Sequence, residues 1–197
     1  GTSDEAASAN HLVARLPVVL CPLLLLSVTA LSAFAFTRYF DVTDEGLMLH
    51  LLMFGSESPF FTTFQILFHP IGMALGHSLL FYRYLHLLLV LMAGGVGSYV
   101  VWRHGTDDAE RSVAEGISFT ALGTSIAVAA GFPGYPTLWY TGVTFIGATL
   151  WTAGILGASS PQIRGYTNAW AMVGAVGAFL AYTGRFPNGA LMSLLGI

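Results

Sequence analysis

Residues 40–54 read FDVTDEGLMLHLLMF, and this stretch lies between two long apolar segments. The stretch and the residues that follow it up to Arg83 hold four of the ten acidic residues of the chain: Asp41, Asp44, Glu45 and Glu57. Ionisable residues at the edge of a membrane span are costly and rare. The acidic stretch is therefore the first place to look for a functional site.

The composition is that of a membrane protein. The chain has 197 residues, of which 55% are hydrophobic and 9% are charged, and its mean hydropathy is +0.71. A soluble domain is about 25% charged. The apolar runs are long rather than alternating, which favours helices over a barrel. We expect an all-α, polytopic membrane helix bundle of about five to six transmembrane helices, with juxtamembrane helices in the first extracytoplasmic loop.

Charge and cysteine content exclude several classes of protein. The formal net charge is -3, and no basic surface interleaved with aromatic residues indicates nucleic acid as a partner. Cys21 is the single cysteine, so the chain has no disulfide framework.

The apolar segments predict the domain organisation. We expect residues 1–11 to form a disordered tail and residues 12–197 to form one transmembrane module. The expected spans cover residues 16–36, 79–102, 113–130, 137–156 and 170–182. A last apolar run stops at Ile197 and is too short to cross, which indicates the truncated N-terminal module of a longer protein. A signal peptide cleaved after Ala35 is disfavoured, because the first apolar run is longer than a usual signal core.

Two shorter segments lie between the first two spans. We expect residues 44–54 to form a helix that is capped by Asp41 or Thr43, ended by Gly55 and too short to span. We expect residues 62–75 to form a second short helix interrupted at His69-Pro70, which either lies along the interface or crosses as a short span. The first alternative puts more arginines on the cytoplasmic side, and the positive-inside rule prefers it. The acidic loop is then extracytoplasmic, on the same side as Arg83 and Arg185.

Carboxylates and arginines at the level of the lipid headgroups are suited to an enzyme that transfers a group from a lipid-linked phosphate donor to an acceptor. A carboxylate can deprotonate an acceptor hydroxyl, and arginine can hold a phosphate leaving group. The alternative is that Asp41, Asp44 and Glu45 only cap and solvate the start of a helix.

The order of several short motifs resembles a known family. Four segments follow the first span: Thr43-Asp44-Glu45-Gly46-Leu47, Glu57-Ser58-Pro59-Phe60-Phe61, His69-Pro70-Ile71-Gly72 and an Arg83 that opens the next span. Tyr182-Thr183-Gly184-Arg185 follows a later span rich in small residues. Over about residues 12–190 the chain resembles the N-terminal part of GT-C membrane glycosyltransferases. It is most similar to the branch of protein mannosyltransferases and bacterial aminoarabinose transferases that act on lipid A.

The resemblance implies a function and assigns roles to residues. Asp44 is the catalytic base and Glu45 its neighbour, while Arg83 and Arg185 contact the donor phosphate or anchor the loop. His69 is kept as a further candidate for substrate binding. The donor is a polyprenyl-phosphate sugar, the acceptor a lipid, glycan or protein, and the reaction inverts the anomeric centre. The location is the bilayer of a prokaryotic plasma membrane, where the enzyme serves the cell envelope.

No cofactor is certain from the resemblance. Several relatives carry a second acidic residue in a later extracytoplasmic loop, where this chain has Gly131-Phe132-Pro133-Gly134-Tyr135-Pro136. A divalent cation therefore stays an open alternative, with no metal ligand assigned. The missing C-terminal part also leaves open that the chain is inactive alone.

Other polar residues have a simpler interpretation. His50, His77 and His86 match no metal-ligand spacing and are expected to be packed or interfacial. Asp107, Asp108 and Glu110 lie among arginines and are expected in a solvated loop. A transporter or flippase-like subunit for an anionic lipid-linked substrate is the alternative function, and a scaffold subunit is a third. A transporter is expected to carry ionisable residues near mid-span, and the expected spans carry none there.

Overall fold

The structure is a computed structural model that describes residues 2–35, 63–76, 78–106, 112–131 and 140–184. Within those ranges every regular element is a helix. The elements are α1 (Thr2–Ala35), α3 (Thr63–Leu75), α4 (Leu79–Gly105), α5 (Val113–Gly131), α6 (Tyr140–Ser159), the 3₁₀ helix η3 (Pro161–Tyr166) and α7 (Thr167–Gly184). The prediction of an all-α membrane helix bundle is confirmed.

Four stretches of the described chain are long and apolar enough to cross a membrane: Arg15–Ala35, Leu79–Gly105, Val113–Gly131 and Thr141–Ser159. The protein is therefore an integral membrane protein, as predicted. The fifth expected span lies in α7, which has 18 residues but is not among those four. The last apolar run, from residue 185 on, lies outside the described residues.

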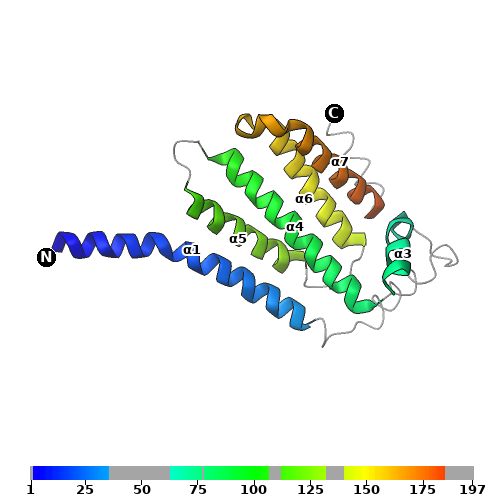
Figure 1. Cartoon of the computed structure of the whole chain (residues 1–197), viewed down its shortest axis with the longest axis horizontal. Helices are drawn as coiled ribbons and strands as arrows, with labels where there is room; N and C mark the ends of the chain where they lie inside the picture. Colours follow the sequence, from blue (N-terminus) through cyan, green and yellow to red (C-terminus); the bar gives the residue numbers. More distant parts are fainter. Residues whose placement is uncertain (1, 36–62, 77, 107–111, 132–139, 185–197) are drawn as a thin grey trace.

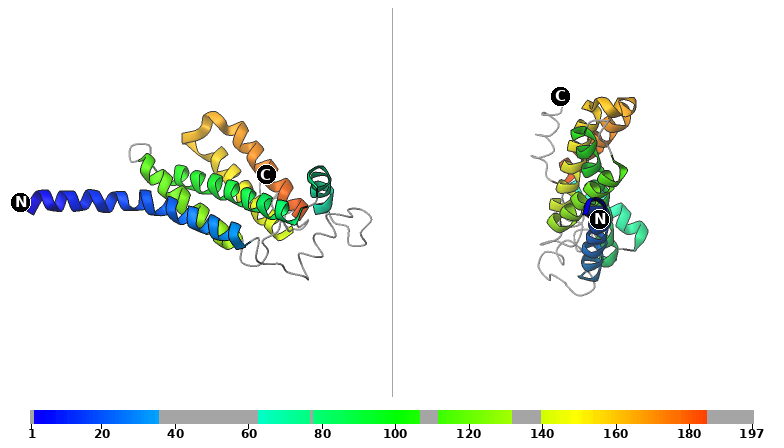
Figure 2. Two further views of the ribbon diagram at one scale, coloured as in Figure 1. Left: turned by 60° about the horizontal axis from the view of Figure 1, so that its bottom comes forward. Right: turned by 90° about the vertical axis from the view of Figure 1, so that its left-hand side faces the viewer.

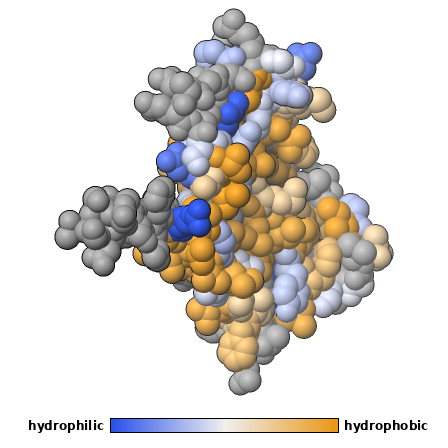
Figure 3. Space-filling view, turned by 60° about the vertical axis from the view of Figure 1, so that its left-hand side comes forward, coloured by the Kyte–Doolittle hydropathy of each residue, from blue (hydrophilic) through white to orange (hydrophobic). Residues whose placement is uncertain are grey.

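The helices form a layer that is close to one helix thick. In Figure 1, α1, α5, α4, α6 and α7 lie side by side in that order, and each packs on the next. The end-on view in Figure 2 shows how narrow this row is. Many large apolar side chains of the row are exposed, among them Leu88, Met92, Ile126, Val176 and Phe179. Apolar residues also cover most of the face seen in Figure 3, as expected for contact with lipid.

Helix directions divide the layer into two ends. Figure 1 shows that α1, α5 and α7 run one way and that α4 and α6 run the other way. The last residue of α1, the short helix α3 and the first residues of α4 and α6 share one end, which we call the α3 end. The last residue of α4, the first residue of α5 and η3 share the other, which we call the η3 end.

This arrangement decides between the two alternatives for residues 62–75. Because α1 ends and α4 begins at the same end of the layer, the chain between them makes no net crossing. The 13-residue α3 lies at an angle across that end, as the interfacial alternative predicted. Which end faces the cytoplasm stays a prediction.

Two local features differ from the predictions. The helix α1 begins at Thr2 and includes residues 2–11, where we expected a disordered tail. Three alanines and two acids near the helix start favour a helix in this segment.

The helix α3 is continuous through Pro70, although proline removes a backbone donor. Phe68 and Ile71 pack against the core on both sides of Pro70, and this burial holds the helix together. Gly76, with φ of +83°, then ends it.

Glycines bring α6 and α7 into close contact. A Cβ on Gly154 would collide with the backbone of Gly174, and a Cβ on Gly177 would collide with the backbone at Trp151. Backbone atoms cannot turn away as side chains do, so any larger residue would push the two helices apart. Small residues at helix interfaces are typical of membrane bundles.

Candidate functional site

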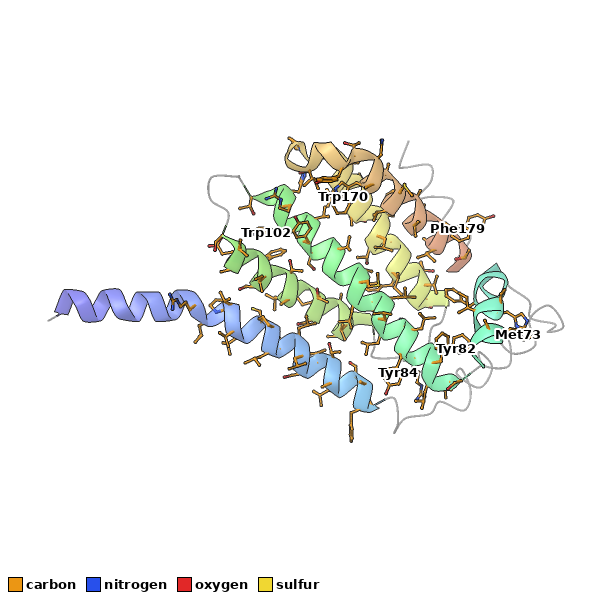
Figure 4. The ribbon with its side chains drawn as sticks, in the orientation of Figure 1. Met73, Tyr82, Tyr84, Trp102, Trp170 and Phe179 are labelled. Atoms are coloured by element: carbon orange, nitrogen blue, oxygen red, sulfur yellow. The ribbon has the colours of Figure 1, made fainter. Side chains whose placement is uncertain are left out.

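A buried apolar cluster joins the helices at the α3 end. It contains Phe68 of α3, Tyr82, Leu87 and Val90 of α4, Val128 of α5, and Val143 and Ile146 of α6. The Tyr82 side chain, at the start of α4 beside α3 (Figure 4), is completely buried. This cluster packs α3 against the other helices through Phe68 and Ile71.

Arg83 is buried in the second turn of α4, directly after Tyr82. Its side chain is only 2% exposed, and it interacts with other groups of the protein. A guanidinium stays charged at any pH that a protein experiences, and a buried charge is costly unless other groups compensate it. The resemblance to GT-C enzymes implied that Arg83 contacts the donor phosphate or anchors the loop. Its burial favours anchoring.

His86 lies on the same side of α4 as Arg83, three residues further along. Its side chain is fully buried and lies over Gly142 near the start of α6. A Cβ on Gly142 would come within 2.6 Å of His86 Nε2. From the sequence we expected a packed or interfacial histidine at this position, and its packing is confirmed. The spacing of three residues between Arg83 and His86 on a helix was the signal that could have linked the two.

The other candidate residues are described unequally. His69 of α3 is half-buried next to the core residue Phe68 and interacts with other groups. Asp44, Glu45 and Arg185 lie outside the described residues. Their described neighbours in the chain are Ala35 and Thr63, which flank the acidic stretch, and Gly184, which precedes Arg185. Ala35, Thr63 and Gly184 lie at the α3 end (Figure 1), as do Arg83 and His69.

Among the described side chains, no group of three or more histidines, cysteines and acids lies close enough together to hold a metal ion. The acids of the expected catalytic loop and the loop acids Asp107, Asp108 and Glu110 lie outside that part of the chain. The open alternative of a divalent cation therefore stays untested.

Comparison of the chain with protein-family models, with curated proteins and with solved structures finds no match. The resemblance to GT-C glycosyltransferases thus rests on the motifs of the sequence alone.

Proposed function

We propose that this protein is a membrane glycosyltransferase that moves a sugar from a polyprenyl-phosphate donor to an acceptor hydroxyl on the extracytoplasmic side. Asp44 acts as the general base, with Glu45 beside it, and the anomeric centre is inverted. The observation that carries the proposal is that Arg83 and His69 lie at the same end of the helix layer as Ala35, Thr63 and Gly184, the described residues that border the acidic stretch and Arg185 in sequence.

Burial gives Arg83 its role in this proposal. The Arg83 side chain is only 2% exposed, so it is buried among protein atoms rather than open to an incoming substrate. It is suited to attract and hold the carboxylates of the neighbouring loop, because charge-assisted hydrogen bonds strengthen away from water. Arg185 is left to contact the donor phosphate. The lipid tail of the donor remains in the bilayer while its phosphate lies at headgroup level.

The described spans support an enzyme over a transporter. Arg83 and His86 are within the first eight residues of α4, and Glu115 is in the first turn of α5. No Asp, Glu, His, Lys or Arg lies near the middle of the four described spans. A path for an ionic substrate through the bilayer is expected to carry such groups at mid-depth.

The direct test is Asp44→Asn in membranes that contain the protein, assayed with radiolabelled sugars on undecaprenyl phosphate. Loss of a general base lowers the rate by about 10²–10⁴-fold, and we expect a loss of that size. Asp107→Asn is the matched control, because Asp107 is expected in a solvated loop at the other end, and its rate should be unchanged. Full transfer by Asp44→Asn would exclude the assigned base. Donor flipping by the wild type in liposomes without sugar transfer would favour the transporter.

A further inference from the structure

A groove opens at the η3 end, far from the proposed catalytic site. It has a volume of about 610 Å³ and lies between α1, α4 and α5. The residues that line it are Pro22 and Leu25 of α1, Tyr99, Trp102 and Arg103 of α4, and Val113, Gly116, Ile117, Thr120, Ala121 and Thr124 of α5. No lining residue is acidic, and most of the wall is apolar.

The length of the groove matches one leaflet of a bilayer. Its α5 wall runs from Val113 to Thr124, which at 1.5 Å per residue is about 16 Å. The hydrocarbon core of a membrane is about 30 Å thick, so one leaflet contributes about 15 Å. The groove therefore extends from the end of the spans to about the middle of the membrane.

The outer end of the groove carries a cation and two aromatic rings. Arg103 is in the last turn of α4 and lines the groove. Trp102 and Tyr99 stand beside it with their ring centroids 6.1 Å apart, and Figure 4 shows Trp102 near the η3 end of α4. Tyrosine and tryptophan prefer the headgroup level of membranes. Among the described residues, the acid Glu115 of α5 is exposed and is not part of the groove wall. The Arg103 side chain also interacts with other groups of the protein.

The shape of the Trp102 side of the groove depends on Gly116. A Cβ on Gly116 would come within 2.7 Å of the Trp102 ring. The six-membered ring of the indole can approach α5 this closely only because residue 116 has no side chain. A second groove, between α4, α5 and α6, shares no lining residue with the first and has no charged residue in its wall.

We propose that the groove at the η3 end binds an anionic phospholipid, with one acyl chain along α5 and the phosphodiester at the Arg103 guanidinium. Charge complementarity selects this occupant: arginine matches a phosphate oxygen pair in geometry and charge, and the apolar wall matches a chain of one leaflet. The site goes beyond the glycosyltransferase proposal, because it lies at the other end of the spans and involves none of the same residues.

The test measures lipid retention by native mass spectrometry. The purified protein in detergent is equilibrated with phosphatidylglycerol or with phosphatidylcholine of the same acyl chains. We expect one phosphatidylglycerol to be retained in preference to phosphatidylcholine. Arg103→Gln should lower phosphatidylglycerol retention about tenfold, in line with the loss of a charge-assisted hydrogen bond. Arg15→Gln is the matched control, because Arg15 is an exposed arginine that begins the apolar part of α1 and lines neither groove. It should retain the lipid.

A second pair of variants tests the groove itself. Thr120→Trp fills this groove, whereas Thr152→Trp places the same bulk in the second groove. Only Thr120→Trp should lose the lipid, and a thermal melt of each variant confirms that it is folded. Equal retention of both lipids, retention by Arg103→Gln at the wild-type level, or loss in Thr152→Trp but not in Thr120→Trp would each overturn the proposal.

Discussion

The contact between His86 and Gly142 shows how one missing side chain makes room for a buried polar ring. His86 is fully buried in the same turn of α4 as Arg83, and its Nε2 occupies the space that a Cβ on Gly142 would need. The glycine therefore sets how closely α6 approaches α4 at His86. A larger residue must move the imidazole or push the two helices apart.

We predict that Gly142→Ala destabilises the protein by about 1–3 kcal/mol, the usual cost of overpacking a well-packed core. Gly105→Ala is the control, since a Cβ there meets nothing within 4 Å. Unfolding in detergent, followed by circular dichroism, measures both variants. If the clash is with the imidazole, combining Gly142→Ala with His86→Ala should give less than the sum of the two single losses. Strict additivity would contradict this explanation.

The pair α6 and α7 is the closest helix contact in the described fold. Gly147 and Gly154 of α6 approach the backbone of α7, and Gly174 and Gly177 of α7 approach α6. Lipid chains are as apolar as leucine, so burial of apolar surface adds little to helix association in a membrane. Close packing supplies the attraction instead. This explains how α7 packs closely on α6 although it is not among the four stretches that are long and apolar enough to cross a membrane.

Gly154→Ala should weaken this pair by about 1–3 kcal/mol, because its Cβ would meet backbone atoms that cannot relax separately. Gly165→Ala, in η3, has open space around the new Cβ. Its free energy of unfolding should lie within about 0.5 kcal/mol of the wild-type value. Thermal melting in detergent checks both. A Gly154→Ala protein as stable as the wild type would mean that α6 and α7 can separate without loss, contrary to the packing argument.

The molecule as a whole is an open row of helices with different chemistry at its two ends. The α3 end holds the buried Arg83 and His86. It also holds Ala35 and Thr63, the described residues that border the acidic stretch in sequence. The η3 end holds Arg103 with its aromatic neighbours. A single row leaves both faces in contact with lipid or with further protein, and it separates the two ends by the full length of the spans.

This topology predicts which residues are accessible from which side of the membrane. In a Cys21→Ala background, the single variants His104→Cys and Gly165→Cys should react with an impermeant maleimide from one side. Ser78→Cys should react only from the other. All three positions are exposed, and the positive-inside rule puts the first two in the cytoplasm. Labelling of Ser78→Cys from the same side as His104→Cys would mean that α4 does not cross.

The positions of the membrane-spanning helices could largely be predicted from the amino-acid sequence. Runs of about 20 apolar residues determine where helices cross, because a backbone in lipid must satisfy its own hydrogen bonds. The described spans begin and end within a few residues of the predicted ones, and the 3₁₀ helix η3 lies between two of the predicted spans. The continuity of α3 through Pro70 could not be foreseen, since it depends on burial of Phe68 and Ile71 against other helices. The roles of Asp44, Glu45, His69, Arg83 and Arg185 stay predictions.

Local sequence was enough to establish an all-helical membrane protein with a polar end near Arg83, because hydropathy and helix length act within each segment. It could not establish that α5 lies between α1 and α4, that Arg83 and His86 are both buried and His86 packs over Gly142, or that Arg103 lines a groove of one leaflet's length. Those features arise from contacts between segments far apart in the chain. Such contacts depend on the fit of side chains across helix faces, which the composition of any one helix does not contain.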